Sequence, residues 1–449
     1  MQKYADYVSV PTEWLAELPS HWECKKIGSL FSERKTKVSD KDYQPLSVAK
    51  IGVVPQLETA VKTDAGDNRK LVCAGDFVIN SRSDRKGSCG VSELDGSVSL
   101  INIVLTPRSQ WNGKYVHYLM RSQPFSEEYY RYGRGIVSDL WTTRFSEMKN
   151  ILLPIPPRFE QDQIVRFLDW KVSMINRLIN TKRKEIKTVD AMKRSMVSSA
   201  VTHGLNSDAP MKFSGVKWLG NIPEHWETIK LRQLLHPVSV KNHPELPLLS
   251  VVREQGVIVR DVTDKEANHN FIPDDLSGYK MVKKGQFAMN KMKAWQGSYG
   301  ISDYTGIVSP AYFIFDVTFD NLEYFHYAIR SKVYVNFFAQ ASDGIRVGQW
   351  DLQMDKMKEI PFIVPPADEQ IAIVDYIKET LPRYDVAIDK LTAEVEMLEE
   401  YKEKLIADVV IGKINVQDVD IPEYEFIDEE ADSESDSDDD SNDTEEQED

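Results

Sequence analysis

Two histidines stand in matching surroundings, and what chemistry they could perform is the first question that this sequence raises. PSHWE surrounds His21, and PEHWE surrounds His225. Two such side chains could bind a metal ion, form a catalytic pair, or mark a duplication. None of the eight histidines has the spacing of a zinc-binding pair such as H-E-x-x-H. We therefore predict a repeated structural element, in which the proline sets a turn, Trp22 and Trp226 pack against a domain core, and the histidine caps the turn.

Other residue patterns that carry chemistry are also missing from the sequence. There is no G-x-x-x-x-G-K-[ST] phosphate loop and no Rossmann-type glycine pattern in context. IPPR and VPPA resemble the motif of amino-methyltransferases only superficially, because both lack the Asn or Asp that accepts an adenine amino hydrogen and the aromatic residue that stacks on a flipped base. We expect no catalytic residue, no metal site and no cofactor in this chain.

The composition favours a folded protein of the cytoplasm. Hydrophobic residues make up 41% of the 449 residues, and the three cysteines are isolated, which favours a reducing compartment over a disulfide scaffold. The N-terminal stretch MQKYADYVSVPTEW has no uninterrupted apolar core, and no apolar run approaches the ~18 residues that span a bilayer. We therefore expect neither a signal peptide nor a membrane partner.

Charge is distributed unevenly along the chain. The net charge is −16, but residues 423–449 contain sixteen Asp and Glu and no Lys or Arg, which leaves 55 acidic and 55 basic residues in the remainder. The acidic segment has almost no apolar residues to bury, so we expect a disordered tail. It either keeps the protein soluble, or it occupies a basic groove and weakens non-specific DNA binding.

The sequence repeats itself in register over most of its length. His225 follows His21 by 204 residues, and GDFVIN returns 210 residues later as GQFAMN. The pairs YVHY and YFHY, Trp141 and Trp350, and IPPRFEQDQIV and VPPADEQIAIV are each separated by 209 residues. A nearly constant offset across such a length predicts a tandem duplication.

Each copy is predicted to contain a strand-rich domain followed by a long helix. Short β-type runs such as KLVCAGDFVIN and SPAYFIFDV, punctuated by Gly, Asn and Asp, predict strands joined by long loops. A Pro-Pro pair then favours the start of a new element. The predicted segments are strand-rich domains at 14–153 and 218–362, helical regions at 154–205 and 363–415, a linker at 206–217 and the tail at 423–449.

The two helical regions carry a heptad pattern. Apolar residues alternate at steps of four and three, and neither helix has enough apolar surface for a core of its own, so we expect the two to pack together. Gly204 and Gly412 lie where each helix should end. The predicted seam consists of Leu168, Val172, Ile175, Ile179, Ile186 and Val189 in the first helix, and of Ile377, Leu381, Ile388, Leu391, Val395 and Leu398 in the second.

These features together resemble the specificity subunit of type I restriction–modification systems, up to about residue 420. The resemblance is carried by PPRFEQDQIV and PPADEQIAIV before the helices, by THGLN and SGVKWLGNIPEHWE at the central joint, and by NKMKAWQGSYG and GIVSPAY in the second domain. It implies an α+β fold with internal pseudo-two-fold duplication, in which two target-recognition domains are separated by an intramolecular antiparallel coiled coil. The acidic tail departs from the family pattern.

The resemblance also implies what the chain binds. Each recognition domain would read one half of a split double-stranded DNA sequence, and the helices would dock two methyltransferase subunits, which two motor-nuclease subunits can join. S-adenosylmethionine, ATP and Mg would then be bound by those partners. Independently, a seam of about 29 residues spans ~43 Å, enough to separate two DNA-reading domains by one turn of B-DNA, ~34 Å.

Candidate DNA-binding residues lie in loops whose flanking residues match between the two copies but whose inner residues differ. We call the matching flanking residues the loop frame. Asn80 and Gly87 align with Asn290 and Gly297, and a second matched loop precedes the tryptophans Trp141 and Trp350. Arg and Lys can read guanine, and Asn and Gln can read adenine. The candidates are Arg82, Arg85, Lys86 and Arg134 in the first copy, and Lys291, Lys293, Trp295, Gln296, Arg346 and Gln349 in the second.

Several alternatives stay open at this point. The candidate loop residues could instead be solvated charges or phosphate contacts, which position a protein on DNA without specifying sequence. The basic helix stretch at 180–194 could face solvent, a partner or DNA. The whole chain could also be a phage- or plasmid-borne interaction protein that redirects or inhibits a methyltransferase complex, or a recognition module of another defence enzyme.

Overall fold

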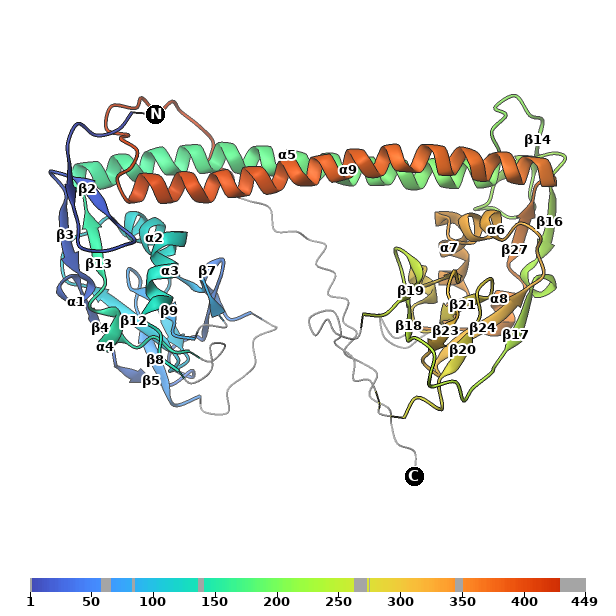
Figure 1. The fold of residues 1–449 in the computed structure, drawn as a ribbon, viewed down its shortest axis with the longest axis horizontal. Helices are drawn as coiled ribbons and strands as arrows, with labels where there is room; N and C mark the ends of the chain where they lie inside the picture. The colour runs from blue at the N-terminus through green and yellow to red at the C-terminus, as the bar shows by residue number, and fades with distance from the viewer. Residues whose placement is uncertain are drawn as a thin grey trace. The chain divides into compact units, whose positions relative to one another are not determined.

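The computed structural model describes residues 2–57, 66–82, 85–135, 141–261, 273, 275–343 and 350–428. The described part of the chain divides into two compact units, one formed by residues up to Lys182 together with residues 393–428, and one of Arg183–Thr392. Each unit joins a strand-rich domain to parts of both long helices (Figure 1). The predicted α+β class, with two strand-rich domains and a helix pair, is confirmed.

The strand-rich domain of unit 1 is built around a four-stranded antiparallel sheet in the order β10-β9-β12-β4. Three strands form a second sheet, β11-β8-β5, and the remaining strands pair as β1-β2, β3-β13 and β6-β7. The elements are β1 (Tyr7–Ser9), β2 (Glu17–Pro19), β3 (Glu23–Lys26), α1 (Ile27–Leu30), β4 (Phe31–Glu33), β5 (Lys37–Val38), β6 (Leu46–Ala49), β7 (Gly52–Pro55), β8 (Arg69–Val72), β9 (Phe77–Asn80), β10 (Cys89–Val91), β11 (Gly96–Val98), β12 (Asn102–Pro107), α2 (Gly113–Arg121), α3 (Gln123–Arg131), α4 (Phe145–Met148) and β13 (Leu152–Ile155).

The strand-rich domain of unit 2 repeats this plan. Its four-stranded antiparallel sheet has the order β17-β24-β21-β22, and the other pairs are β14-β15, β16-β27, β18-β19, β20-β23 and β25-β26. The elements are β14 (Met211–Phe213), β15 (Asn221–Pro223), β16 (Glu227–Lys230), η3 (Leu231–Gln233), β17 (Leu235–Val238), β18 (Leu249–Val252), β19 (Gly256–Val259), β20 (Lys280–Val282), β21 (Phe287–Asn290), η4 (Ala294–Gln296), β22 (Tyr299–Ile301), β23 (Gly306–Val308), β24 (Tyr312–Val317), α6 (Leu322–Ile329), α7 (Lys332–Gln340), β25 (Ser342–Asp343), β26 (Asp351–Leu352), α8 (Met354–Lys358) and β27 (Pro361–Val364).

The predicted duplication is visible in strand register as well as in strand order. Asn80 of β9 lies opposite Asn102 of β12, and Asn290 of β21 lies opposite Tyr312 of β24, at the same end of the same strand pair. Strand β14 falls within the segment 206–217, which was expected only to link the two halves. It pairs with β15 as β1 pairs with β2, so this segment belongs to the repeated unit.

Two long helices follow the strand-rich domains. Helix α5 covers Arg158–His203, α9 covers Ala367–Val410, and each begins after a Pro-Pro pair that disfavours a helical residue before it. Gly204 and Gly412 follow their ends with φ of 75° and 78°, a left-handed conformation that glycine adopts without strain. A Cβ at Gly204 would lie 3.0 Å from the ring of Trp226, so each helix ends directly against the tryptophan of the repeated motif, as Gly412 does against Trp22.

The helices run antiparallel where they meet within each unit. In unit 1, Lys182 Nζ lies 3.1 Å from Glu394 Oε2, and Lys402 Nζ donates to Asn176 Oδ1 further along both helices. In unit 2, Lys193 pairs with Asp385. The structure buries Leu168, Ile175, Ile179, Ile377 and Val395 of the predicted seam, and it half-buries Val172, Ile186, Val189, Leu381, Ile388, Leu391 and Leu398.

The beginning of the predicted acidic tail makes ordered contacts with α5, contrary to the expectation of disorder from residue 423. Ser173 Oγ donates to the carbonyl of Glu425, and Asn176 Nδ2 donates to the carbonyl of Ile427. Asn180 Nδ2 donates to the carbonyl of Asp428. Side-chain donors on one face of α5 thus bind backbone carbonyls of residues 425–428, and these hydrogen bonds do not require uncharged side chains in that segment. Residues 429–449 lie outside the described residues.

Candidate nucleic-acid interface

In both domains the same loop frame holds a loop at the end of the four-stranded sheet. Asn80 Oδ1 accepts from the backbone N–H of Arg82 at 3.1 Å, and Asn290 Oδ1 accepts from that of Met292 at the same distance. The backbone N–H groups of the two asparagines donate to the carbonyls of Ser88 and Ser298, which close the loops. An asparagine side chain that bonds the backbone two residues on is a common way to start a turn. The frame is therefore a local property of the sequence, repeated twice.

Inside the first frame, the predicted basic residues are exposed. The structure exposes Arg82, Arg85 and Lys86, and Lys86 Nζ lies 5.8 Å from the centre of the Tyr130 ring. Among the residues that the structure describes, no carboxylate lies within ion-pair distance of Arg82. An exposed guanidinium with five donors can bind a base edge or a phosphate.

The second predicted loop of unit 1 lies beside the first. Arg82 and Arg134 both form β-bridges with Thr142, and Arg134 exchanges two backbone hydrogen bonds with it, at 3.0 and 3.2 Å. Thr143 N also donates to the carbonyl of Ser81. Residues separated by about fifty positions in the sequence thus form one exposed basic group.

The second domain fills its frame differently. Lys291 lies 3.2 Å from Asp351 Oδ2, so part of its charge is already balanced within the domain. Lys293 precedes η4, which carries Trp295 and Gln296, and all three residues are half-buried. The Trp295 and Trp350 rings are 5.2 Å apart, which favours packing between them over stacking on a base. Arg346 and Gln349, also predicted here, lie outside the described residues.

The two candidate loops of unit 2 come together as they do in unit 1. The backbone N–H of Leu352 donates to the carbonyl of Lys291, and β25 pairs with β26 so that Asp343 lies opposite Asp351. Asp343 occupies the position of Arg134, 209 residues later. The same geometry therefore presents arginine in one domain and a carboxylate in the other, so their surfaces differ in charge as well as in residue type.

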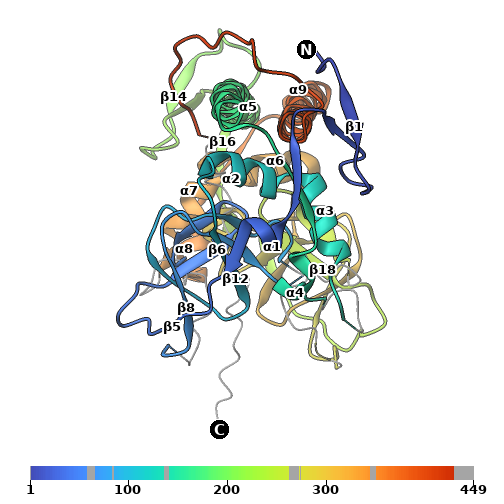
Figure 2. The ribbon, with the colours of Figure 1, turned by 90° about the vertical axis from the view of Figure 1, so that its left-hand side faces the viewer.

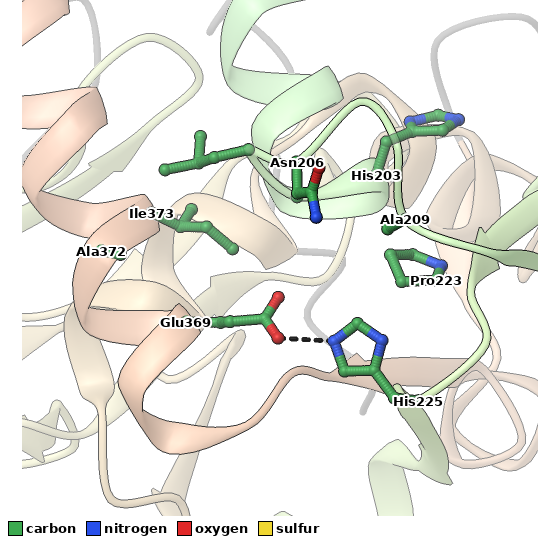
Figure 3. Close-up of a pocket in the computed structure, with 10 residues that line it drawn as sticks. His203, Asn206, Ala209, Pro223, His225, Glu369, Ala372 and Ile373 are labelled. Atoms are coloured by element: carbon green, nitrogen blue, oxygen red, sulfur yellow. Dashed lines mark hydrogen bonds and ion pairs between the residues drawn. The ribbon is translucent and has the colours of Figure 1, made fainter.

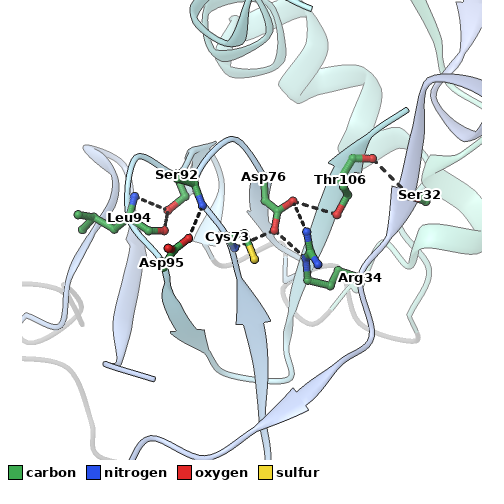
Figure 4. A network of polar contacts seen from close by, with 9 residues as sticks. Ser32, Arg34, Cys73, Asp76, Ser92, Leu94, Asp95 and Thr106 are labelled. Carbon is green, nitrogen blue, oxygen red and sulfur yellow. Dashed lines mark hydrogen bonds and ion pairs between the residues drawn. The ribbon is translucent and has the colours of Figure 1, made fainter. Parts of the chain in front are cut away.

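Several other arginines are unavailable for DNA because the fold uses them. Arg34 donates from Nε and Nη2 to the buried carboxylate of Asp76, which also accepts from Thr106 Oγ1 and Cys73 N (Figure 4). These hydrogen bonds raise the pKa of Arg34 above its ordinary value. Buried Arg69 donates to the side chain and carbonyl of Ser97. Composition alone could not separate these structural cations from the exposed ones.

His117 and Arg121 of α2, and His326 of α6 with Arg330 directly after it, were not predicted as structural residues. His117 Nδ1 accepts from Val91 N at 3.3 Å, and His326 Nδ1 accepts from Ile301 N at 3.2 Å. Arg121 and Arg330, four residues further on, donate to carbonyls of the neighbouring hairpin. The only sequence signal was the repeat of YVHY as YFHY.

Burial lowers the pKa of both imidazoles to about 4, with smaller contributions from the charges of Arg121 and Lys114 at His117 and of Arg330 at His326. Both rings are therefore neutral near pH 7, as a nitrogen that accepts from a backbone N–H requires.

The repeated PxHWE motif is the joint between each strand-rich domain and the helices. His21 Nε2 lies 2.9 Å from Glu160 Oε2 in the first turn of α5, and His225 Nε2 lies 2.5 Å from Glu369 Oε1 in the first turn of α9. Trp22 and Trp226 are buried, as expected. The prediction that the histidine caps its own turn was wrong. Its side chain binds a glutamate in the first turn of a long helix instead. Figure 2 shows strand β1 beside α9, where Tyr7 Oη donates to the carbonyl of Gly412.

Comparisons with known proteins find relatives that are named as type I restriction specificity subunits. No protein-family model matches the chain. The chain is 26% identical to the type I restriction enzyme MjaVIII specificity subunit of Methanocaldococcus jannaschii, over 60% of this chain and 64% of that protein, so this match spans slightly less than two thirds of the relative. A second protein of that organism, provisionally named the MjaX type I specificity subunit, is 22% identical over 90% of this chain and 96% of its own length.

One solved structure shares the fold of this chain. A chain from a structure of complex assembly and conformational transition in the type I restriction–modification system superposes with a TM-score of 0.58, at 12% identity, over 88% of this chain and 99% of that chain. The predicted resemblance to type I specificity subunits is confirmed. The duplicated domains and the helix pair are thus features that the chain shares with a type I system protein, and the specificity-subunit relatives match over most of the same sequence.

No helix in the described part of the chain is long and apolar enough to cross a membrane. No group of three or more His, Cys, Asp or Glu side chains there is arranged to hold a metal ion.

Proposed function

We propose that this chain is the DNA sequence-recognition and scaffold subunit of a type I restriction–modification complex, and that it has no catalytic activity of its own. The observation that carries the proposal is one loop frame that occurs twice with different polar contents. A shared scaffold with different exposed donors is what two domains need if they read different base sequences. The two relatives described above are named as type I specificity subunits, which supports the same function.

In this proposal the two domains contribute unequally to readout. The exposed Arg82, Arg85, Lys86 and Arg134 can supply several charged donors to one half-site. In the other domain Lys291 is paired with Asp351, and Lys293 and Gln296 remain candidates for base contact. We therefore expect the first domain to contribute more of the salt-dependent phosphate affinity.

The catalytic steps are assigned to partners. Two methyltransferase subunits would dock on the helices and would bind S-adenosylmethionine, and two motor-nuclease subunits that use ATP and Mg can join the assembly. The helices expose several apolar side chains that a docked partner could cover, including Met174, Leu178, Met192, Val386 and Met397.

The test is to map methylated bases in the genome of the source cell with and without this gene. The proposal predicts one split motif, two short specific halves around a fixed gap, that loses methylation when the gene is deleted. An unchanged methylation pattern would contradict it. A motif that changes to a different motif instead of disappearing would favour a protein that redirects an existing methyltransferase.

A further inference from the structure

Unit 2 contains a cavity of about 280 Å³ at the joint between its strand-rich domain and the helices (Figure 3). Its wall includes Gly204 and Asn206 after α5, Pro223 and His225 of the repeated motif, and Glu369 of α9. His225 and Glu369 border the open space in Figure 3, joined by their hydrogen bond. The volume is near the lower end of pockets that hold small ligands, roughly 300 Å³. The cavity combines apolar walls with a carboxylate that could accept a hydrogen bond.

In unit 1, Tyr4 contacts the residues that correspond to His225, Trp226 and Glu369. Its ring centre lies 5.6 Å from that of His21 and 5.8 Å from that of Trp22, and its hydroxyl donates to Glu160 Oε1. Tyr4 is 6% exposed, and the side chain of Glu160 has no exposed surface. Tyr4 thus supplies, in unit 1, a ring and a hydroxyl at the counterparts of His225 and Glu369, two residues that line the cavity of unit 2.

The register of the strands identifies which residue stands in the place of Tyr4 in unit 2. Strands β1 and β2 pair with Tyr7 opposite Pro19, and β14 and β15 pair with Met211 opposite Pro223. Counting three residues back from Tyr7 and from Met211 gives Tyr4 and Asp208.

Asp208 cannot replace the tyrosine. It is exposed, it carries no ring, and an ionised carboxylate has no proton to donate to Glu369. The side chain of Glu369 is accordingly 36% exposed, whereas that of Glu160 is fully buried. Trp226 Nε1 donates to Glu369 Oε2 at 3.0 Å, but a carboxylate offers about four lone-pair sites and can accept a further hydroxyl.

We propose that the cavity of unit 2 binds a tyrosine side chain presented by another polypeptide, with the phenol hydroxyl donating to Glu369 and the ring lying against His225 and Ile373. The partner's tyrosine would stand on an extended segment, as Tyr4 does on the N-terminal segment of this chain. A second copy of this chain is a poor source, because its own Tyr4 is already buried in its unit 1.

The first test measures binding of p-cresol, the side-chain analogue of tyrosine, to the full-length protein by ligand-observed NMR. We expect one site with millimolar affinity, and binding of 4-methylanisole, which has no hydroxyl proton, weaker by about tenfold, as expected for a hydrogen bond to a charged acceptor. Ala372→Trp fills the cavity from the exposed face of α9 and should abolish binding. Ala393→Trp, at an exposed position of the same helix, should leave binding unchanged. No p-cresol binding, or equal binding to both tryptophan variants, would overturn the proposal.

The second test separates a polypeptide partner from a small phenolic ligand. Acetyl-Lys-Tyr-Ala-amide, which carries the sequence around Tyr4, should bind more tightly than p-cresol and should compete with it. The matching phenylalanine peptide should bind more weakly than the tyrosine peptide. If p-cresol binds more tightly than the peptide, the site is one for a small phenol, and the assignment to a partner polypeptide is wrong.

A third variant uses the occupied copy as an internal standard. Tyr4→Ala empties the equivalent pocket at Glu160 and should create a second p-cresol site in a protein that keeps its first. If this variant unfolds in part, the wild-type measurements still decide the question, because they do not depend on it. A stably folded Tyr4→Ala protein that binds no additional p-cresol would contradict the equivalence of the two pockets.

Discussion

Acid should destabilise this protein through His117 and His326. Both imidazoles accept a hydrogen bond from a backbone N–H, and both have a pKa lowered from 6.5 to about 4, chiefly by burial. Because the lowered pKa favours the neutral ring, the stability that each contributes is complete above about pH 6.5 and is lost as the pH falls toward 4. The unfolded chain takes up the two protons first.

The size of the effect follows from the two pKa values. Between pH 8 and pH 5, a shift from 6.5 to about 4 corresponds to about 2 kcal/mol for each histidine. The rings keep some contact with solvent, which weakens the penalty for charging them, so we expect about 1–2 kcal/mol each.

The assay is urea unfolding at pH 8 and pH 5. His117→Asn and His326→Asn keep an oxygen that can accept from the backbone but cannot titrate, so each variant should lose less stability than the wild type between the two pH values, by about 1–2 kcal/mol. His236→Asn removes an exposed histidine and serves as the control. If the wild type and the double variant lose the same free energy of unfolding between pH 8 and pH 5, the assignment of these rings as neutral acceptors is wrong.

Three further predictions concern DNA. Arg82→Ala should relax one half-site at a cost of about 1–3 kcal/mol if the guanidinium binds a base, whereas a uniform loss with a shallower salt slope would identify a phosphate contact. Insertion of one heptad into each of α5 and α9 should lengthen the gap in the methylated motif, and an unchanged gap would show that the helices do not set it. Deletion of residues 429–449 should tighten non-specific DNA binding at low salt in a filter-binding assay if the acidic segment competes for a basic surface, and unchanged affinity would leave it a solubilising role.

The fold was predictable where its signals were local and repeated. The heptad spacing and the Pro-Pro starts predicted α5 and α9, because apolar residues recur along the sequence at the period of a helix. The matched loops could be found because Asn80 and Asn290 each form a turn with their own neighbours. Such contacts depend on few residues, so duplication preserved them.

The long-range contacts were not predictable in the same way. His21 was expected to cap a turn, but its partner Glu160 lies 139 residues away, and nothing in the spacing links the two. The ordered contacts of residues 425–428 were hidden by their acidic composition, since α5 binds mainly their backbone carbonyls, and Arg177 adds an ion pair with Glu425. The pairing of Lys291 with Asp351 likewise could not be read from a loop that is simply rich in lysine.

If each duplicated loop reads one half of a split DNA sequence, the methylated motif in living cells will show it. The motif should be mapped in cells that carry the gene with Arg82, Arg85 and Lys86 changed to alanine, and in cells that carry it with Lys293 and Gln296 changed to alanine. We expect each variant to alter or relax one half of the motif and to leave the other half and the gap unchanged. Loss of both halves together in variants that remain folded, or no change in either, would contradict it.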